Sequence, residues 1–246
     1  MDDASRAATA PFTSRTAEAA PGGEDAALLE RLMRERYSCR AFLPEAVPDA
    51  VIARILEMAQ RTASWCNSQP WQTVITKGAA TERFREAMYR HAGENAEWSS
   101  DLPRPREYRG VYLQRRRESG FQLYNTLGIP RGDKAGYERQ AMENFRLFGA
   151  PHVAIVTTDE ALDVYGAVDC GAFVGNFMLA AQSLGVASVA QAALARFAPF
   201  VRAHFGIPDD RLLVCGISFG YADAAHPANG YRTSRASVAE AVTFVE

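Results

Sequence analysis

The pattern of hydrophobic positions predicts helices in the first quarter of the chain. Apolar residues recur at the interval of one helix face at Leu28, Leu29, Leu32 and Met33. This spacing predicts a short amphipathic helix from Asp25 to near Arg36. A second helix is predicted to open at Pro48, because proline is favoured at the first helical position.

Downstream, short apolar runs and amphipathic segments follow one another irregularly. The runs predict strands over 71–77, 153–157, 187–192 and 212–221, with a further terminal strand over 242–245. The amphipathic segments predict helices over 81–91 and 163–184 and one that ends at Gly206. Because strands and helices mix without a regular βαβ alternation, the pattern favours an α+β fold over a doubly wound sheet.

The long predicted helix 163–184 carries Gly171 and Gly175 one turn apart. Two glycines at this spacing leave a bare strip where another helix can approach closely. The ordinary interpretation is packing within the core of one chain, and the more specific one is packing between two subunits.

The organisation predicted along the chain is a single domain with two appendages. Residues 1–26 are polar and rich in alanine, which predicts a mobile arm or an arm that lies over a partner subunit. Residues 27–246 form the domain, interrupted by an arginine-rich, aromatic excursion over 95–136 that should contain helices. No apolar run is long enough for a membrane span, and the start lacks the apolar stretch of a secretory signal.

Composition and charge narrow the classes of function. The formal net charge is −2 and the isoelectric point is about 6.1, which argues against nucleic acid or an anionic membrane as a partner. Four widely separated cysteines without a CxxC pair indicate reduced thiols in the cytoplasm and no metal site. There is no GxGxxG after a predicted strand and no phosphate-binding GxxxxGK[ST] loop.

The basic residues are almost all arginines. Of the 27 basic side chains, only Lys77 and Lys134 are lysines. Any Schiff-base chemistry would have to use one of these two residues. Arginine grips phosphate with two parallel hydrogen bonds, so converging arginines would suit an anionic ligand.

Two segments carry such arginines at close spacing. In the segment 36–42, Arg36, Ser38 and Arg40 alternate, so an extended backbone would present them on one side as a phosphate clamp. A second pair, Arg232 and Arg235, lies beyond the last predicted core strand. Taken alone, either pair could also be a solvated surface feature.

Between the two arginine pairs lies a polar loop, 64–71, with the sequence SWCNSQPW. Pro70 predicts an extended conformation for Gln69. The hydroxyl and carboxamide groups of the loop could hydrogen-bond a flat heterocycle with alternating donors and acceptors. The loop and the two arginine pairs together suggest one planar ligand that bears a phosphate.

These segments resemble the FMN-dependent nitroreductase family. The resemblance rests on R-x-S-x-R-x-F at 36–42, S-x-x-N-S-Q-P-W at 64–71, A-Q-A-A-L at 190–194 and R-x-x-R at 232–235, in that order. It covers about 25–245 and implies an α+β, three-layer α-β-α fold with a mixed, mainly antiparallel sheet. It also implies an intertwined homodimer with FMN at the subunit interface, in which the tail 227–246 wraps across the partner.

The resemblance implies roles for individual residues. Arg36, Ser38 and Arg40 match positions that hold the FMN phosphate and ribityl chain, and Arg232 and Arg235 match the terminal phosphate pair. Arg40 also approaches the ring, where it could stabilise negative charge. The implied cofactor-binding set is Arg36, Tyr37, Ser38, Arg40, Ser64, Asn67, Ser68, Gln69, Gln191, Ala192, Arg232 and Arg235. The sequence departs from the family pattern at Ala63 and Ala190, where the family often has proline.

The implied activity is a ping-pong transfer of two electrons from NAD(P)H to a nitroaromatic or quinone-like substrate. No side chain needs to act as a nucleophile, because FMN carries the chemistry. A substrate pocket is expected from Trp65, Tyr112, Phe121 and Tyr124, although such aromatics can also serve only to bury the excursion. The four histidines are expected to be structural or solvated. A reductive dehalogenase, a flavin-cleaving enzyme and a non-catalytic flavin-binding protein remain alternatives on the same scaffold.

Overall fold

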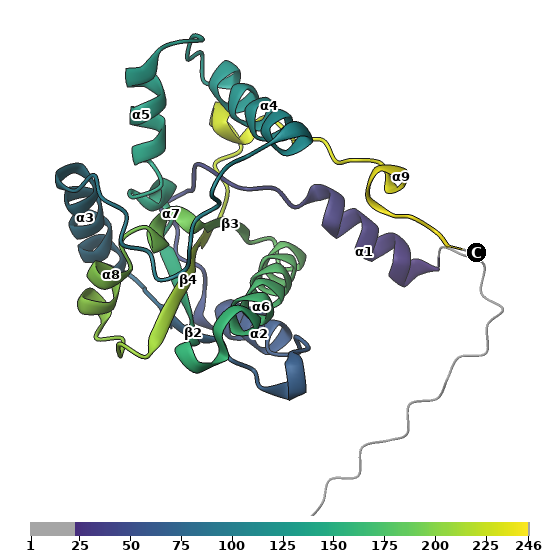
Figure 1. Ribbon diagram of the computed structural model, residues 1–246, viewed down its shortest axis with the longest axis horizontal. Helices are drawn as coiled ribbons and strands as arrows, with labels where there is room; N and C mark the ends of the chain where they lie inside the picture. The colour runs from purple at the N-terminus through teal and green to yellow at the C-terminus, as the bar shows by residue number, and fades with distance from the viewer. Residues whose placement is uncertain (1–22, 246) are drawn as a thin grey trace, which may run out of the picture.

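A four-stranded antiparallel sheet lies at the centre of the part that the computed structural model describes, residues 23–245 (Figure 1). The strands are β1 (Gln72–Ile75), β2 (His152–Asp159), β3 (Ala187–Gln191) and β4 (Arg211–Gly220), in the order β1-β2-β4-β3. Every strand pair is antiparallel, and a parallel contact comes from the isolated bridge between Ser38 and Ser188. The expected arm over 1–26 lies almost entirely outside the described residues.

Alternate residues of β2 enter two separate cores, as the period of a strand requires. Val153 and Ile155 pack on one face of the sheet with α3 (Ala79–Glu94), α7 (Ala192–Ala195) and α8 (Ala198–Phe205). Ala154 and Val156 pack on the other face with α2 (Asp49–Ala59) and α6 (Asp163–Ser183). The three-layer α-β-α arrangement is therefore confirmed.

The helix α6 has one buried side and one exposed side. Phe173 and Phe177 are buried against the sheet, whereas Val164, Tyr165 and Val168 are exposed. A Cβ added at Gly171 or Gly175 would meet nothing within 4 Å, so no helix of the described chain fills the bare strip. The segment Glu160–Ser183 passes a length and hydropathy test for a membrane span, a test that the core helix of a soluble protein also passes.

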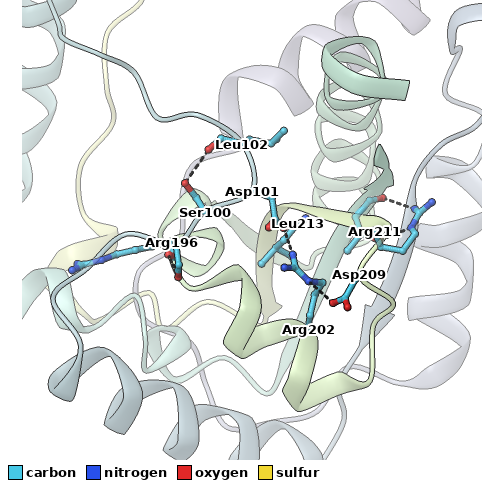
Figure 2. Close-up of polar contacts among 10 residues, drawn as sticks. Ser100, Asp101, Leu102, Arg196, Arg202, Asp209, Arg211 and Leu213 are labelled. Atoms are coloured by element: carbon cyan, nitrogen blue, oxygen red, sulfur yellow. Dashed lines mark hydrogen bonds and ion pairs between the residues drawn. The ribbon is translucent and has the colours of Figure 1, made fainter. Parts of the chain in front are cut away.

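The excursion contains two helices, α4 (Gly110–Thr126) and α5 (Lys134–Met142). Its first segment is fastened to the core by Asp101, whose carboxylate pairs with Arg202 of α8 and accepts from the Leu213 N–H at 2.8 Å (Figure 2). The Ser99 N–H donates to the Arg196 carbonyl at 2.9 Å, close to the end of α7. These contacts hold the first segment of the excursion, which follows α3, against α8, β4 and the end of α7.

The remaining elements are short or lie at the ends of the described chain. They are α1 (Glu24–Glu35), α9 (Val238–Ala241) and the 3-10 turns η1 (Trp65–Asn67), η2 (Leu147–Gly149), η3 (Glu160–Leu162) and η4 (Pro227–Asn229). The terminal strand expected over 242–245 is wrong, because these residues are exposed and pair with no strand in the described chain. A Ser237–Glu240 capping box starts α9 instead. Pro48 precedes the first residue of α2 rather than occupying it.

Candidate functional site

The first arginine segment is extended because it borders the sheet. Ser38 forms a bridge with Ser188 of β3, and the Cys39 N–H donates to the Ser188 carbonyl at 3.1 Å. Cys39 is fully buried, so Arg36, Ser38 and Arg40 are directed away from the core, as their alternation predicts. The segment therefore presents two guanidinium groups and a hydroxyl on one side.

A buried asparagine joins this segment to the C-terminal tail. Asn229 is 5% exposed, and its Oδ1 accepts a hydrogen bond from the Arg40 N–H at 2.8 Å. Its Nδ2 donates to the carbonyls of Ala41 at 2.8 Å and Asp223 at 2.9 Å. The sequence interpretation assigned Asn229 no role, although its place in a Pro-Ala-Asn-Gly turn was a signal for a fixed backbone.

The two arginine pairs consequently meet in one cavity of about 400 Å³. We call it the arginine cavity. Among the described residues no carboxylate lines it, and two serines add hydroxyl groups. Its lining residues are Met33, Arg34, Arg36, Tyr37, Ser38, Arg40, Ser119, Tyr231, Arg232, Thr233 and Arg235.

Arg40 and Arg232 are held by neutral partners rather than by acids, whereas Arg34, at the edge of the cavity on α1, pairs with Glu30. Arg40 donates to the Ser38 carbonyl at 3.1 Å and the Tyr231 hydroxyl at 3.2 Å. Arg232 lies over the Tyr37 ring, 3.6 Å from its centroid. Burial, together with the charge of Arg235, lowers the pKa of Arg36, as expected where cations gather without a counter-charge. This donor set fits a phosphate, which would supply the missing negative charge and accept several hydrogen bonds.

Burial also changes the acidity of the two tyrosines that line the cavity. It raises the pKa of Tyr37 and that of Tyr231, so both phenols stay neutral around pH 7. The arginine cavity therefore keeps its positive charge across the neutral range.

The loop 64–69 lies elsewhere in the chain, and none of its residues lines the arginine cavity. It is held on α6 by the Asp169 carboxylate, which accepts from the Trp65 N–H at 3.1 Å and the Ser68 hydroxyl at 3.5 Å. The Trp65 ring meets the Tyr165 ring edge to face, with centroids 4.1 Å apart. Within one chain, the two arginine pairs therefore lie in the same cavity, and the loop 64–69 lies outside it.

The conformation expected for Gln69 is wrong. Its φ is +48°, in the left-handed region, and Asn67 shares this with a φ of +56°. The Gln69 N–H donates to the Ser64 Oγ at 2.9 Å, and its side-chain amide donates to the Asn67 carbonyl at 3.1 Å. These bonds close a tight turn that outweighs the preference imposed by Pro70.

The segment at the end of β3 is anchored by its glutamine. Gln191 is buried, and its Nε2 donates to the Asn144 carbonyl at 2.8 Å while its Oε1 accepts from the Ser218 hydroxyl. The nitrogen and the oxygen of its side-chain amide are therefore both hydrogen-bonded within the protein. Ala192, the first residue of α7, is exposed.

The four aromatic residues expected to form a substrate pocket do not gather in one chain. Phe121 lies under Arg131 at 4.6 Å, and Tyr124 stacks on Tyr137 with centroids 4.2 Å apart, so both pack within the excursion. Tyr112 is exposed on α4, and Trp65 belongs to the loop on α6.

A second cavity, of about 630 Å³, adjoins Arg40. It has an apolar wall that includes Phe42, Phe148 and Ile129, and a charged rim that includes Arg139 and Glu143. Arg40 thus lines two cavities, one rich in arginine and one partly apolar.

The buried histidine His152 has a structural environment outside both cavities. His152 is buried, accepts from the Val47 N–H at 3.0 Å and stacks on Phe219. Burial lowers its pKa. Within residues 23–245 no group of three or more His, Cys, Asp or Glu residues could hold a metal ion.

Comparisons with known proteins give one consistent result. The model of the nitroreductase family matches residues 33–221. Nitroreductase NfnB of Mycolicibacterium smegmatis is 38% identical over 217 residues, which cover 87% of this chain and 92% of that protein. A 4-nitrobenzoate reductase of a Nocardioides species is 33% identical, with 88% and 89% of the two chains covered.

Solved structures agree with the sequence comparisons. The structure of FMN-dependent nitroreductase NfnB from Mycobacterium smegmatis in complex with NADPH superimposes with a TM-score of 0.86. It is 36% identical, and the match covers 91% of this chain and all of that one.

Proposed function

The chain belongs to the nitroreductase family, and we propose that it is an FMN-dependent oxidoreductase that reduces nitroaromatic or quinone-like substrates with NAD(P)H. The observation that carries the proposal is the arginine cavity, where five guanidinium groups meet without a carboxylate among the described lining residues. Relatives described as nitroreductases and as a 4-nitrobenzoate reductase support the choice of substrate class.

In this proposal, Arg36, Arg232 and Arg235 hold the flavin phosphate, with the Ser38 hydroxyl as a further donor. Arg40, which lines both cavities, holds positive charge at the boundary between the phosphate site and the partly apolar cavity. The bound FMN supplies hydride and electron transfer between NAD(P)H and the substrate. The protein contributes position and a fixed positive field.

We further propose that the protein works as a homodimer. The loop 64–69 would then reach the cofactor of the partner subunit, which accounts for its absence from the arginine cavity of its own chain. The apolar residues that α1, α6 and the tail leave exposed support this, since a monomer rarely leaves so many uncovered. Trp65, Ser64, Asn67, Ser68 and Gln69 would complete the site from the second chain.

Two finer assignments belong to the same proposal. The substrate is a small aromatic molecule that enters beside Arg40, with Trp65, Tyr112, Phe121 and Tyr124 as candidate contacts in the assembled dimer. The location is the cytoplasm, supported by four free cysteines, three of them buried and unpaired in the described chain.

Flavin binding tests the cofactor assignment. The purified protein should be yellow or should gain a flavin spectrum on reconstitution with FMN. Arg235→Glu should abolish the gain, because it places a carboxylate where phosphate is expected to bind. Arg117→Glu, a change of the same kind on an exposed residue outside the cavity, is the control. A wild-type protein that binds no flavin would refute the proposal.

Turnover tests the reaction. Anaerobic NAD(P)H should bleach the bound flavin, and a nitroaromatic or a quinone should restore the colour. Absence of bleaching with flavin bound would instead favour a reductive dehalogenase or flavin-cleaving activity on this scaffold. Bleaching without reoxidation by any nitroaromatic or quinone would contradict the substrate class.

A further inference from the structure

The helix α4 of the excursion, which lies far in sequence from both arginine pairs, forms part of the arginine cavity. Ser119 of α4 lines the cavity together with Arg36 and Arg235. Figure 1 shows α4, in teal, beside the yellow C-terminal tail as the tail leaves the core. The sequence interpretation expected this excursion to serve the substrate, so its place at the arginine cavity calls for a different role.

The hydroxyl of Ser119 is free to bind a ligand. Among the described residues, none exchanges a hydrogen bond with this hydroxyl, although Ser119 is half-buried. Other half-buried hydroxyls of the excursion are used: the Thr126 Oγ1 donates to the Gln122 carbonyl at 2.8 Å, and the Ser100 Oγ to the Leu102 carbonyl at 2.9 Å. A hydroxyl that shares a cavity with five guanidinium groups is a suitable donor to an anion.

The same face of α4 holds the tail that carries Arg235. The Ser234 Oγ donates to the Glu118 carboxylate at 3.2 Å, and the Arg115 guanidinium lies 3.6 Å from the Glu240 carboxylate. A groove of about 400 Å³ between α4 and residues 233–236 opens beside the arginine cavity and shares Ser119 and Arg235 with it. Arg235 is thus positioned between α4 and the first arginine segment.

A buried acceptor on the next turn of α4 also lacks a partner. The Oε1 of Gln122 is buried without a hydrogen bond in the described chain, and Gln122 lines the same groove three residues after Ser119. Residues three apart lie on one face of a helix. The inner face of α4 therefore carries two polar groups that have no hydrogen-bond partner among the described protein atoms.

We propose that α4 is a wall of the phosphate site and that the Ser119 hydroxyl donates a hydrogen bond to the phosphate of the flavin. The inference rests on the proposed FMN function and extends it, since it assigns to the excursion a role in holding the cofactor. Glu118 and Arg115 act as positioning residues, because they hold the tail segment that presents Arg235.

Flavin titration of the apoprotein, followed by fluorescence quenching, tests the proposal. Ser119→Ala should raise the Kd for FMN at least about tenfold, the effect of losing one hydrogen bond to a charged group. Ser119→Thr keeps the hydroxyl and should bind FMN almost as the wild type does. Gln114→Ala, on an exposed residue of the same helix that lines neither the cavity nor the groove, is the matched control.

Riboflavin, which lacks the phosphate, separates a direct contact from a structural effect. Ser119→Ala and the wild type should bind riboflavin equally. If Ser119→Ala binds FMN as tightly as the wild type, or loses affinity for riboflavin and FMN alike, the phosphate contact is refuted. Binding of FMN by the wild type reports separately on the proposed function, so the two failures are distinguishable.

Discussion

Individual buried polar residues hold the loops and segments of this protein in place. Arg211 is 7% exposed and donates to the Pro70 carbonyl at 2.8 Å and the Thr157 carbonyl at 3.0 Å. Figure 2 labels Arg211 and marks its polar contacts with dashed lines. Pro70 follows directly on the loop 64–69, so Arg211 fixes the end of that loop against the irregularity between Val156 and Thr157 of β2.

Replacing this arginine should destabilise the fold. Arg211→Leu leaves the buried Pro70 carbonyl without its donor and leaves the Thr157 carbonyl with only the weakly donating Cys170 thiol at 3.7 Å. The free energy of unfolding should therefore fall by about 3 kcal/mol. Urea denaturation measures the change. Arg54→Leu, which removes an exposed arginine paired only with Glu57, should cost less than about 1 kcal/mol. Equal losses in the two variants would contradict the role of Arg211.

His152 should make stability depend on pH. Its Nε2 accepts from the Val47 N–H, and burial lowers its pKa, so the native state keeps the ring neutral. The unfolded chain, with an ordinary pKa of about 6.5, binds a proton first as the pH falls. This contribution to stability is therefore complete above about pH 6.5 and is lost as the pH falls through the lowered pKa.

The measurement compares urea midpoints at pH 7.5 and 5.5. The wild type should be less stable at pH 5.5, and His152→Gln, which cannot titrate, should lose part of that difference. The pKa of His204 is also lowered by burial, so this residue contributes in the same direction. His152→Gln should therefore keep part of the dependence of stability on pH. An unchanged slope in His152→Gln would exclude His152 as a source.

Among the elements, the excursion shows how a long insertion is secured. The Asp101 carboxylate meets both Arg202 of α8 and the backbone of β4, and the side chains of this ion pair are almost buried (Figure 2). The guanidinium of Arg196 also bonds the Ala96 carbonyl, close to where the excursion begins. The start of the excursion is thereby tied to α7 and α8, the helices that follow Gln191.

Breaking this ion pair should free the excursion. Asp101→Ala leaves the Leu213 N–H without an acceptor and leaves Arg202 with only its 3.8 Å ion pair to the exposed Asp209. The free energy of unfolding should fall by about 3 kcal/mol. Limited proteolysis should cut within 95–109 sooner than in the wild type. Glu30→Ala, which removes the exposed pair with Arg34, is the control and should leave both measurements nearly unchanged. Proteolysis at the wild-type rate would contradict the anchoring role.

At the scale of the whole molecule, large apolar side chains remain exposed on α1, α6 and the tail. Val168 on α6 is 59% exposed, Met33 on α1 is also 59% exposed, and Phe244 in the tail is 82% exposed. α1 buries no residue in the described chain, and in Figure 1 it extends away from the sheet toward the tail. An amphipathic helix without a buried face is expected to find its partner in another chain.

Sedimentation tests this expectation. The wild type should sediment with twice the mass of the 26.9 kDa chain, and its melting temperature should rise with concentration. Val168→Asp places a charge on the exposed face of α6 and should shift the mass toward the monomer. Val111→Asp, on an exposed residue of α4, should leave the dimer intact. A monomeric wild type would refute the homodimer.

The sequence by itself determined most of the elements and the α+β class. The ranges predicted from apolar spacing agree closely with α1, α6, β2 and β4, because local periodicity reports which face of each element is buried. It also singled out the two arginine pairs. It failed over 242–245, where apolar residues suggested a strand but no sheet edge lies beside them in the described chain.

Only the tertiary structure decided which of the candidate binding segments, the two arginine pairs, the loop 64–69 and the excursion, lie together. The arginine pairs share a cavity because Asn229 binds the backbone of residues 40 and 41, a contact between positions almost two hundred residues apart. Ser119 joins them because neighbouring residues of α4 contact the tail, Glu118 through Ser234 and Arg115 through Glu240. Spacing along the chain carries no information on such contacts, since they depend on buried hydrogen bonds between segments that only the packed fold brings together.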